Sequence, residues 1–426
     1  MKNKSIRKAI VLIVCVGAML PAVSSCSDKK EVEKLKKEIE ELEEENDELK
    51  EKLEKYEGNV TEETDASKET EASKETEASD SDAEPSETEA SAVKSEFSEG
   101  LLFISLGNGN AVVAGIGDCT DKDLVIPPTT PDGDTVTEIG EDAFQYAELN
   151  TVVLPDTIQI INDNAFCASI TSINIPEGVI KIGKKAFYYS NITSIELPES
   201  LTEIGEYAFY GSKLTSISIP GSVETISDFA FWDSSLTSIE LHEGTKTIGV
   251  NAFSDTEITE LVIPNGVVDI HEGAFDQNDN LTTVTLPDSV EHIGTYQYCK
   301  ALTSVTLPST LKEIDASAFY KCTTLPSITI PETVTTIGDD AFGETALSSV
   351  VIPASVTLID GNSFSECQYL TSVTILGDIQ WYDEDGDCNA YACFDGCSRL
   401  ETINDMNPVD WANSINEELA DDLGLI

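Results

Sequence analysis

The chain has 426 residues and a formal net charge of −54 at pH 7, of which about −41 lies between residues 100 and 426. Such an acidic surface excludes nucleic acid as a partner, because a phosphate backbone must be neutralised by lysine and arginine. It favours solubility and nonspecific attraction to cationic surfaces or divalent ions. The ten cysteines are irregularly spaced, unlike those of a disulfide-rich scaffold.

Residues 1–25 are predicted to be a lipoprotein signal peptide. Basic residues precede an apolar stretch, Ala9–Leu20, that is too short to span a membrane. The sequence Val23-Ser24-Ser25-Cys26 resembles the lipobox of bacterial lipoproteins. This resemblance implies cleavage before Cys26 and lipid attachment to its sulfur, which would tether the chain to the outer face of a membrane. Ordinary signal cleavage, with Cys26 incidental, is the alternative.

Residues 26–58 are predicted to form a lipid-anchored coiled coil, because apolar residues recur at alternating steps of three and four. The predicted seam consists of Val32, Leu35, Ile39, Leu42, Asn46, Leu49, Leu53 and Tyr56. β-Branched residues at position a with leucine at d favour a parallel homodimer, and Asn46 at position a fixes its register. A single solvated helix is the alternative.

Residues 59–99 are predicted to be a disordered linker rich in Glu, Ser and Thr, because they have too few apolar residues to offset the entropy of ordering. Residues 100–128 are predicted to be an N-terminal cap. Two strand-like runs flank Gly107–Asn110, a pattern typical of a hairpin, and an irregular first repeat ends at Ile126-Pro127.

Residues 129–404 repeat one pattern about every 22 residues, which predicts a solenoid. In the copy at 192–213, alternation places Ile195 and Leu197 inward and Ser194 and Glu196 outward. An aromatic column is predicted to fill the core. Its members are Phe144, Phe166, Phe187, Phe209, Phe231, Phe253, Phe275, Tyr298, Phe319, Phe342, Phe364 and Phe394.

Two further features of each repeat concern its corner. The column that contains Gly205 is mostly glycine, with Asn, Asp or His at most other copies, which predicts a left-handed turn there. Ala208-Phe209 is predicted to begin a tight 3₁₀ or short helical turn.

The pattern L-T-S-I-x-I-P-x-S-V-x-x-I-G-x-x-A-F resembles the BspA-like (treponemal-type) leucine-rich repeat family of bacterial surface proteins over residues 101–404. The resemblance implies a curved, right-handed leucine-rich-repeat solenoid of mostly short parallel β-strands. It also implies exposure at the cell surface and, for some members, binding to proteins or adhesion. The resemblance implies no catalytic residue in this sequence. His242 in the proline column and the long step from Phe364 to Phe394 depart from the pattern.

Two surfaces are candidates for ligand contact: the outward strand positions and an aromatic, acidic insertion at 377–394. The candidate residues are Ser194, Glu196, Ser216, Ser218, Ser238, Glu240, Trp381, Tyr382 and Tyr391. Short hydroxyl groups stacked about 4.8 Å apart could bind an extended protein or glycan. The alternative is that Ser and Thr merely suit exposed strands.

The insertion also contains weak calcium candidates, Asp383, Asp385 and Asp387. Gly386 comes too early for a calcium loop, and Phe394 stands where a closing Glu is needed, so no metal site is predicted. Cysteines in this region lack zinc spacing, which leaves a local disulfide or packing as their role. Residues 405–426 are predicted to form a C-terminal capping helix in which Trp411, Ile415 and Leu419 share one face.

The sequence contains no catalytic constellation and no cofactor motif, so we predict a protein that is not an enzyme and has no cofactor. The leading hypothesis is a lipid-anchored, extracellular protein that binds a host or microbial protein, or mediates adhesion. The alternative is a structural envelope protein whose acidic solenoid binds cations or cell-wall polymers.

Overall fold

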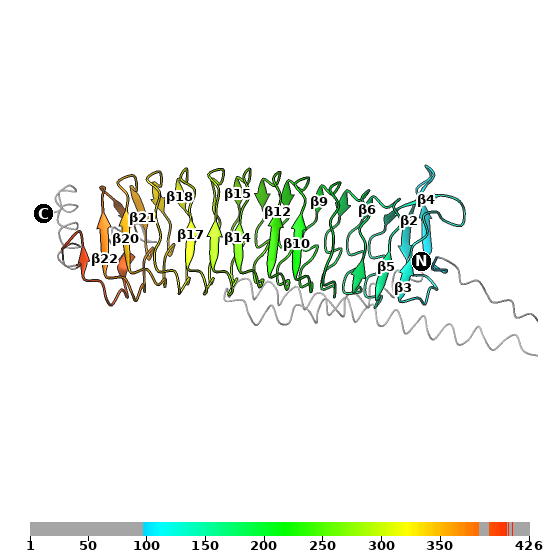
Figure 1. Ribbon diagram of the computed structural model, residues 1–426, viewed down its shortest axis with the longest axis horizontal. Helices are drawn as coiled ribbons and strands as arrows, with labels where there is room; N and C mark the ends of the chain where they lie inside the picture. Colours follow the sequence, from blue (N-terminus) through cyan, green and yellow to red (C-terminus); the bar gives the residue numbers. More distant parts are fainter. Residues whose placement is uncertain (1–96, 383–391, 407, 409–410, 412–426) are drawn as a thin grey trace, which may run out of the picture. The chain divides into compact units, whose positions relative to one another are not determined.

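The computed structural model describes residues 97–382, 392–406, 408 and 411. The predicted signal peptide, coiled coil and almost all of the linker lie outside these residues. Residues 91–426 form a compact unit in which about 12 coils of the chain stack side by side along one axis (Figure 1). Within the described residues, no helix is long and apolar enough to cross a membrane.

The coils contribute strands to two rows. The first row contains β3 (Asp123–Val125), β5 (Thr151–Val153), β7 (Ser172–Ile173), β10 (Ser216–Ile219), β12 (Ser238–Leu241), β14 (Glu260–Val262), β16 (Thr283–Thr285), β17 (Ser304–Thr306), β20 (Ser349–Ile352), β22 (Ser372–Ile375) and β24 (Thr402–Ile403). The second row contains β1 (Leu102–Ser105), β2 (Asn110–Gly115), β4 (Thr135–Ile139), β6 (Ile160–Ile161), β8 (Lys181–Ile182), β9 (Glu203–Ile204), β11 (Thr225–Ile226), β13 (Thr247–Ile248), β15 (Asp269–Ile270), β18 (Glu313–Ile314), β19 (Thr336–Ile337), β21 (Leu358–Asp360) and β23 (Gln380–Tyr382).

The first row confirms the predicted parallel strands and their alternation where strands form, but residues 191–198 and 325–331 contribute no strand, and the predicted inward residues Ile195 and Leu197 are only half-buried. In β10, Ile217 and Ile219 are buried while Ser216 and Ser218 are exposed. Ser216 pairs with Ser238 in β12, 22 positions along the chain. Equal repeat length therefore aligns like residues in adjacent coils, and each column of the sequence becomes a column in space.

The second row of strands was not predicted from the sequence. Most of its strands have two residues, too few to show period-two alternation in the sequence. The row begins with β1 and β2, which pair antiparallel as the predicted hairpin around Gly107–Asn110. From β2 onward its pairings are parallel.

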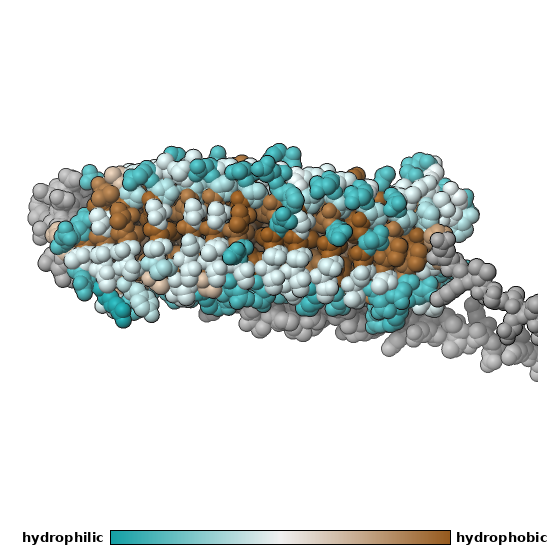
Figure 2. Space-filling model, in the orientation of Figure 1, coloured by the Kyte–Doolittle hydropathy of each residue, from teal (hydrophilic) through white to brown (hydrophobic). Residues whose placement is uncertain are grey.

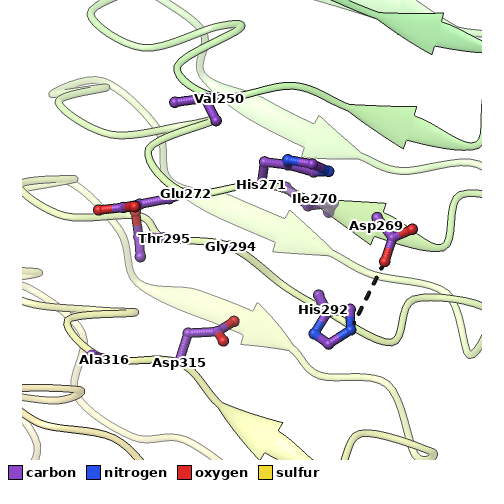
Figure 3. Close-up of a pocket in the computed structure, with 10 residues that line it drawn as sticks. All are labelled: Val250, Asp269, Ile270, His271, Glu272, His292, Gly294, Thr295, Asp315 and Ala316. Carbon is purple, nitrogen blue, oxygen red and sulfur yellow. Dashed lines mark ion pairs between the residues drawn. The ribbon is translucent and has the colours of Figure 1, made fainter. Parts of the chain in front are cut away.

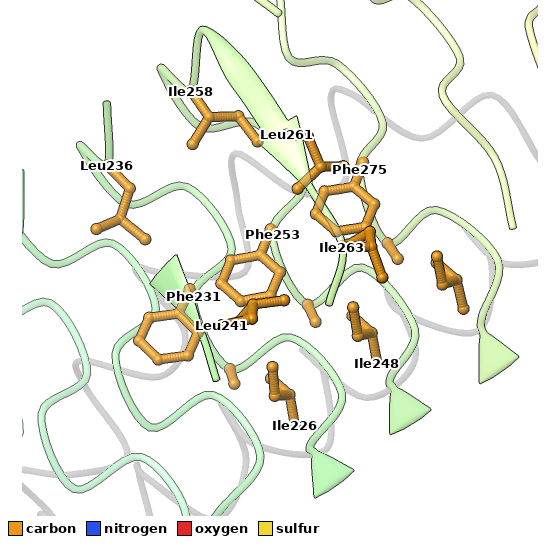
Figure 4. Packing of buried hydrophobic residues seen from close by; sticks show 14 of the residues in the cluster. Ile226, Phe231, Leu236, Leu241, Ile248, Phe253, Ile258, Leu261, Ile263 and Phe275 are labelled. Carbon is orange, nitrogen blue, oxygen red and sulfur yellow. The ribbon is translucent and has the colours of Figure 1, made fainter. Parts of the chain in front are cut away.

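The core is filled by a continuous stack of aromatic rings (Figure 4). Neighbouring ring centroids lie 5.1–5.8 Å apart, and their planes differ by at most 17°. Phe209 is fully buried, 5.2 Å from Phe187 on one side and 5.2 Å from Phe231 on the other. Trp411 is 4% exposed and meets Phe394, the last ring, edge-on at 6.1 Å.

One member of the predicted aromatic column is wrong. Tyr296, not Tyr298, lies in the stack, 5.8 Å from Phe275 and 5.6 Å from Phe319. Tyr298 instead meets Tyr320 edge-on at 5.9 Å. The corner that leads to this ring is two residues shorter than its neighbour, because two residues separate Ile293 from Tyr296 whereas four separate Ile270 from Phe275.

The predicted helical corners are also wrong. Ala392–Phe394 is a 3₁₀-helix, but the other corners of the described chain are non-helical turns. Their N–H groups alternate between partners: Ala186 N donates to Gly183 O in the same coil, and Phe187 N donates to Ala208 O in the next. Left-handed residues interrupt each corner, so a run of helical hydrogen bonds cannot form.

Those left-handed residues do not lie in the predicted glycine column. Of that column only Gly294 has a positive φ, 62°. The left-handed positions come two and six residues after the column, as at Lys185 (φ 55°) and Tyr189 (φ 50°). The glycines serve close approach instead, because a Cβ on Gly205 would lie 2.5 Å from Lys184 N of the preceding coil.

Gly205→Ala is therefore expected to lower the free energy of unfolding by about 2 kcal/mol, because the backbone of the preceding coil must move. Gly178→Ala is the matched control, since the nearest atom to its Cβ would be Ile158 O at 3.3 Å. We expect this control to change stability by about 0.5 kcal/mol or less. Urea unfolding measures both, and equal effects would contradict the close-approach explanation.

Candidate functional site

The outward positions of the first row form an extended exposed surface, which we call the strand face. Ser216 and Ser238 are exposed in one column of strand positions, and Glu240 is exposed in the next; Ser194 and Glu196 are also exposed but lie in a coil segment without a strand. Parallel pairing aligns β14 with β16 and β17, and β20 with β22, in the same way. The strand face thus presents regularly spaced side chains along one side of the solenoid, as the sequence predicted.

The strand face is not uniformly polar. Val262 and Val351 occupy outward positions and are 68% and 54% exposed. In the view of Figure 2, an apolar band runs lengthwise along the solenoid beside a paler row of weakly polar residues. A surface that combines hydroxyl groups with accessible apolar side chains is suited to a protein partner.

Ser218, Glu240 and His242 meet on the strand face. Ser218 Oγ lies 2.9 Å from His242 Nε2 and 3.2 Å from Glu240 Oε2. Glu240 Oε2 also lies 3.8 Å from the same ring nitrogen. In a catalytic triad the carboxylate orients the imidazole through its other nitrogen, so this group does not have that geometry. Its exposed donors and acceptors suit ligand contact.

The 377–394 insertion is described only in part. Backbone pairing extends the second row through β23, opposite β21, with Trp381 in register with Ile359 and Tyr382 with Asp360. Part of the insertion therefore continues the solenoid. Tyr391 and the calcium candidates Asp383, Asp385 and Asp387 lie outside the described residues, as do Ile415 and Leu419 of the predicted cap.

The cysteines near the C-terminal end occupy core positions. Cys322 and Cys367 are fully buried, and their thiols donate to the carbonyl oxygens of Tyr296 (3.2 Å) and Phe342 (3.1 Å). Burial raises the pKa of the Cys322 thiol, which keeps it protonated. Both are free thiols, as is the half-buried Cys397, which supports the packing interpretation.

An aromatic cluster on the corners was missed by the sequence analysis. Its members are Tyr188, Tyr189, Tyr207, Tyr210, Phe229 and Trp232. Tyr188 and Tyr210 stack at 4.9 Å, and Lys185 Nζ lies 5.2 Å from the Tyr188 ring. An aromatic residue directly after the core phenylalanine in three successive repeats was the available signal.

The shortened corner at Ile293–Tyr296 leaves a pocket of about 600 Å³ (Figure 3). Its lining comprises Val250, Asp269, Ile270, His271, Glu272, His292, Gly294, Thr295, Asp315 and Ala316. His292 Nε2 lies 4.0 Å from Asp269 Oδ1. Among the described residues no group of three or more His, Cys, Asp or Glu side chains is arranged to hold a metal ion.

Asp315 compensates for the missing corner residues. The backbone N–H groups of Ile293 and Gly294 donate to its carboxylate. Burial and the nearby Glu313 raise the pKa of Asp315, while His292 and these N–H groups lower it, with the net direction upward. Ion pairs with lysine occur elsewhere on the described solenoid, such as Lys246–Glu224 at 2.8 Å, but no lysine or arginine in these residues pairs with a carboxylate of the pocket.

Comparison with known proteins gives one family. The pattern described as BspA type leucine rich repeat region (6 copies) matches at 137–256, 202–299, 246–371 and 294–410. No curated protein matches the chain.

Solved structures of bacterial repeat proteins are similar to the chain. A leucine-rich repeat protein from Bacteroides ovatus is 22% identical, with 72% of this chain and 93% of that chain covered and a TM-score of 0.45. A leucine rich cell surface protein from Faecalibacterium prausnitzii is 25% identical, with coverage of 66% and 94% and a TM-score of 0.36. The pneumococcal vaccine antigen PcpA is 18% identical, with coverage of 74% and 94% and a TM-score of 0.43.

Proposed function

The chain belongs to the BspA-type leucine-rich repeat family, and from this premise we propose that it binds a protein partner at the bacterial cell surface through its strand face. Proteins of this family are bacterial cell-surface proteins that typically take part in protein binding or adhesion. The observation that carries the proposal is the alignment of exposed outward positions between paired strands of the first row, as between Ser216 and Ser238 and between Ser218 and Glu240. The insertion at 377–394 is the second proposed contact surface.

A structural envelope role is the competing function, and the acidic charge of −54 favours it. The salt dependence of binding distinguishes these two functions. Binding of the full chain to arrayed surface proteins, and to purified cell-wall polymers, is measured in about 0.15 M and about 0.5 M NaCl, because the higher concentration screens exposed charges within a few ångströms. Saturable protein binding that persists at high salt supports the proposal. Polymer binding alone, lost at high salt, supports the envelope role.

We propose that Cys26 anchors the mature chain to the membrane and that residues 26–58 pair two chains in parallel. Cys26→Ala is expected to move the protein from the membrane fraction to the soluble fraction, because the lipid-bearing sulfur is gone. Cys15→Ala, inside the signal peptide, is the control and should leave the protein in the membrane. Fractionation followed by immunoblotting reads both outcomes. Membrane retention of the Cys26 variant would refute the anchor.

A further inference from the structure

Two cysteines, Cys367 and Cys397, occupy equivalent positions in adjacent coils near the C-terminal end. Each follows its core ring by three residues, and these two rings lie 5.6 Å apart. The next residues also align, because Ser398 Oγ donates to Gln368 Oε1 at 3.1 Å. This spacing matches the roughly 4.4–6.8 Å between the Cα atoms of disulfide-bonded cysteines. The fold therefore places the two cysteines at the separation that a disulfide bond requires.

The two thiols also meet as side chains. They share a hydrogen bond, and each Sγ lies 3.1 Å from an equivalent carbonyl oxygen one coil apart, Phe342 O for Cys367 and Phe364 O for Cys397. The hydrogen bond from Cys397 lowers the pKa of the Cys367 thiol more than burial raises it. Because the two side chains share this hydrogen bond, the negative charge belongs to the pair rather than to one sulfur. A thiolate is the reactive form of cysteine, so the arrangement favours reaction.

Access distinguishes this pair from another in the same column. Cys367 is fully buried but Cys397 is only half-buried, so an oxidant in solvent can reach the pair through Cys397. Cys299 and Cys322 are likewise equivalent residues of adjacent coils, and their core rings also lie 5.6 Å apart. Both of these cysteines are fully buried, and burial raises the pKa of each. The chain thus contains a closed pair with the same spacing as an internal control.

We propose that Cys367 and Cys397 form a disulfide bond by exchange with an external disulfide. Cys397 Sγ, as the thiolate, attacks one sulfur of that disulfide, and the other sulfur leaves as a thiolate. Cys367 Sγ then attacks Cys397 Sγ, and the second thiolate leaves. The two protein thiols lose two electrons and two protons, which the external disulfide takes up as it becomes two thiols.

The bond ties the coil that contains β22 to the coil that contains β24, and it closes a loop of the chain that includes the 377–394 insertion. Closing such a loop stabilises a fold by restricting its unfolded state. Disulfides persist in oxidising surroundings such as the outside of the cell. The proposal does not depend on which partner the strand face binds.

Peptide mapping of the full chain tests the bond. The chain is brought to equilibrium with oxidised glutathione at pH 8, and the remaining thiols are alkylated in denaturant. Cleavage after Asp and Glu then places the two cysteines in separate peptides, residues 367–378 and 396–401. We expect mass spectrometry to find these two peptides joined by a disulfide in most of the chain, because structural disulfides resist reduction by glutathione.

Three outcomes would overturn the proposal. The first is a disulfide between Cys397 and a cysteine of residues 388–395, with Cys367 recovered as an alkylated thiol. The second is recovery of Cys397 as a thiol or as its mixed disulfide with glutathione, without the linked peptides. The third is cross-linking of Cys299 to Cys322 to the same extent, since oxidation would then not depend on the access that Cys397 provides.

Two variants locate the effect. Cys397→Ser should abolish the linked peptides, whereas Cys393→Ser, the matched control in the same coil, should leave them unchanged. Hydrogen exchange at Glu401 N, which donates to Thr371 O at 2.9 Å across the same two coils, gives a second measurement. Oxidation should slow this exchange roughly tenfold or more in the control variant and leave it unchanged in Cys397→Ser. Equal exchange before and after oxidation of the control variant would contradict the proposed link between the coils.

Discussion

Replacing Phe209 with alanine is expected to lower the free energy of unfolding by about 3–5 kcal/mol, the largest effect of any single change considered. Phe209 is fully buried and stacks at 5.2 Å against rings in both adjacent coils. Truncation leaves a cavity and removes two ring contacts at once. Since each coil contacts only its neighbours, the weakened interface in the middle of the stack can also separate unfolding into two steps.

Urea unfolding followed by circular dichroism measures this loss. Phe209→Leu should cost less than the alanine change because it leaves a smaller cavity. Tyr189→Ala is the control, since this ring is 45% exposed on the corner, and we expect it to cost well under the core change. If the Phe209→Ala protein is destabilised by less than about 1 kcal/mol, the ring stack does not make the large contribution to stability that is expected here.

Acidification from pH 7 to pH 5 is expected to stabilise the fold, contrary to the usual behaviour of paired carboxylates. Burial raises the pKa of Asp276 from 3.8 to about 6, although Thr295 Oγ1 and Gln297 N each donate to its carboxylate at 2.8 Å. A raised pKa means that the folded state binds the proton more tightly. This contribution is complete below pH 3.8 and is lost as pH rises through about 6.

Asp276→Asn isolates this contribution, because an amide oxygen can still accept both hydrogen bonds but carries no charge. At pH 7 the variant should be more stable than the wild-type chain by about 2 kcal/mol, and the difference should vanish near pH 4. Unfolding free energies measured at intervals from pH 4 to pH 8 give the comparison. A constant difference across that range would contradict a buried, titrating carboxylate.

The repeat period and the inward columns were predictable because they rest on local, recurring chemistry. Ile204, Ala208 and Phe209 are fully buried as the alternation and spacing required. The positions of the left-handed residues in the corner were not predictable, because glycine has two uses. At Gly205 its missing side chain admits a neighbouring backbone, whereas the left-handed positions in this copy are Tyr207 and Gly211. Sequence columns alone do not distinguish close approach from a positive φ.

The pocket escaped the sequence analysis for a related reason. Tyr298 stands at the expected distance from Gly294, so the column was assigned to it and the shortened corner went unnoticed. Only the stacking of Tyr296 between Phe275 and Phe319 shows which ring enters the core. The candidate contact residues of the strand face were predictable, because outward positions follow directly from strand alternation.

Inward columns specify the fold, and we propose that the strand face binds the partner. The most direct test is the affinity of the full chain for the protein partner that is selected at high salt. It is measured for a double variant on the strand face, Ser216→Lys with Ser238→Lys. The control is Thr225→Lys with Thr323→Lys, which adds the same charge at exposed sites off the strand face. Both variants should unfold within about 0.5 kcal/mol of the wild-type chain. We expect roughly a tenfold or greater loss of affinity for the serine variant alone. Unchanged affinity in the serine variant, or an equal loss in both, would contradict it.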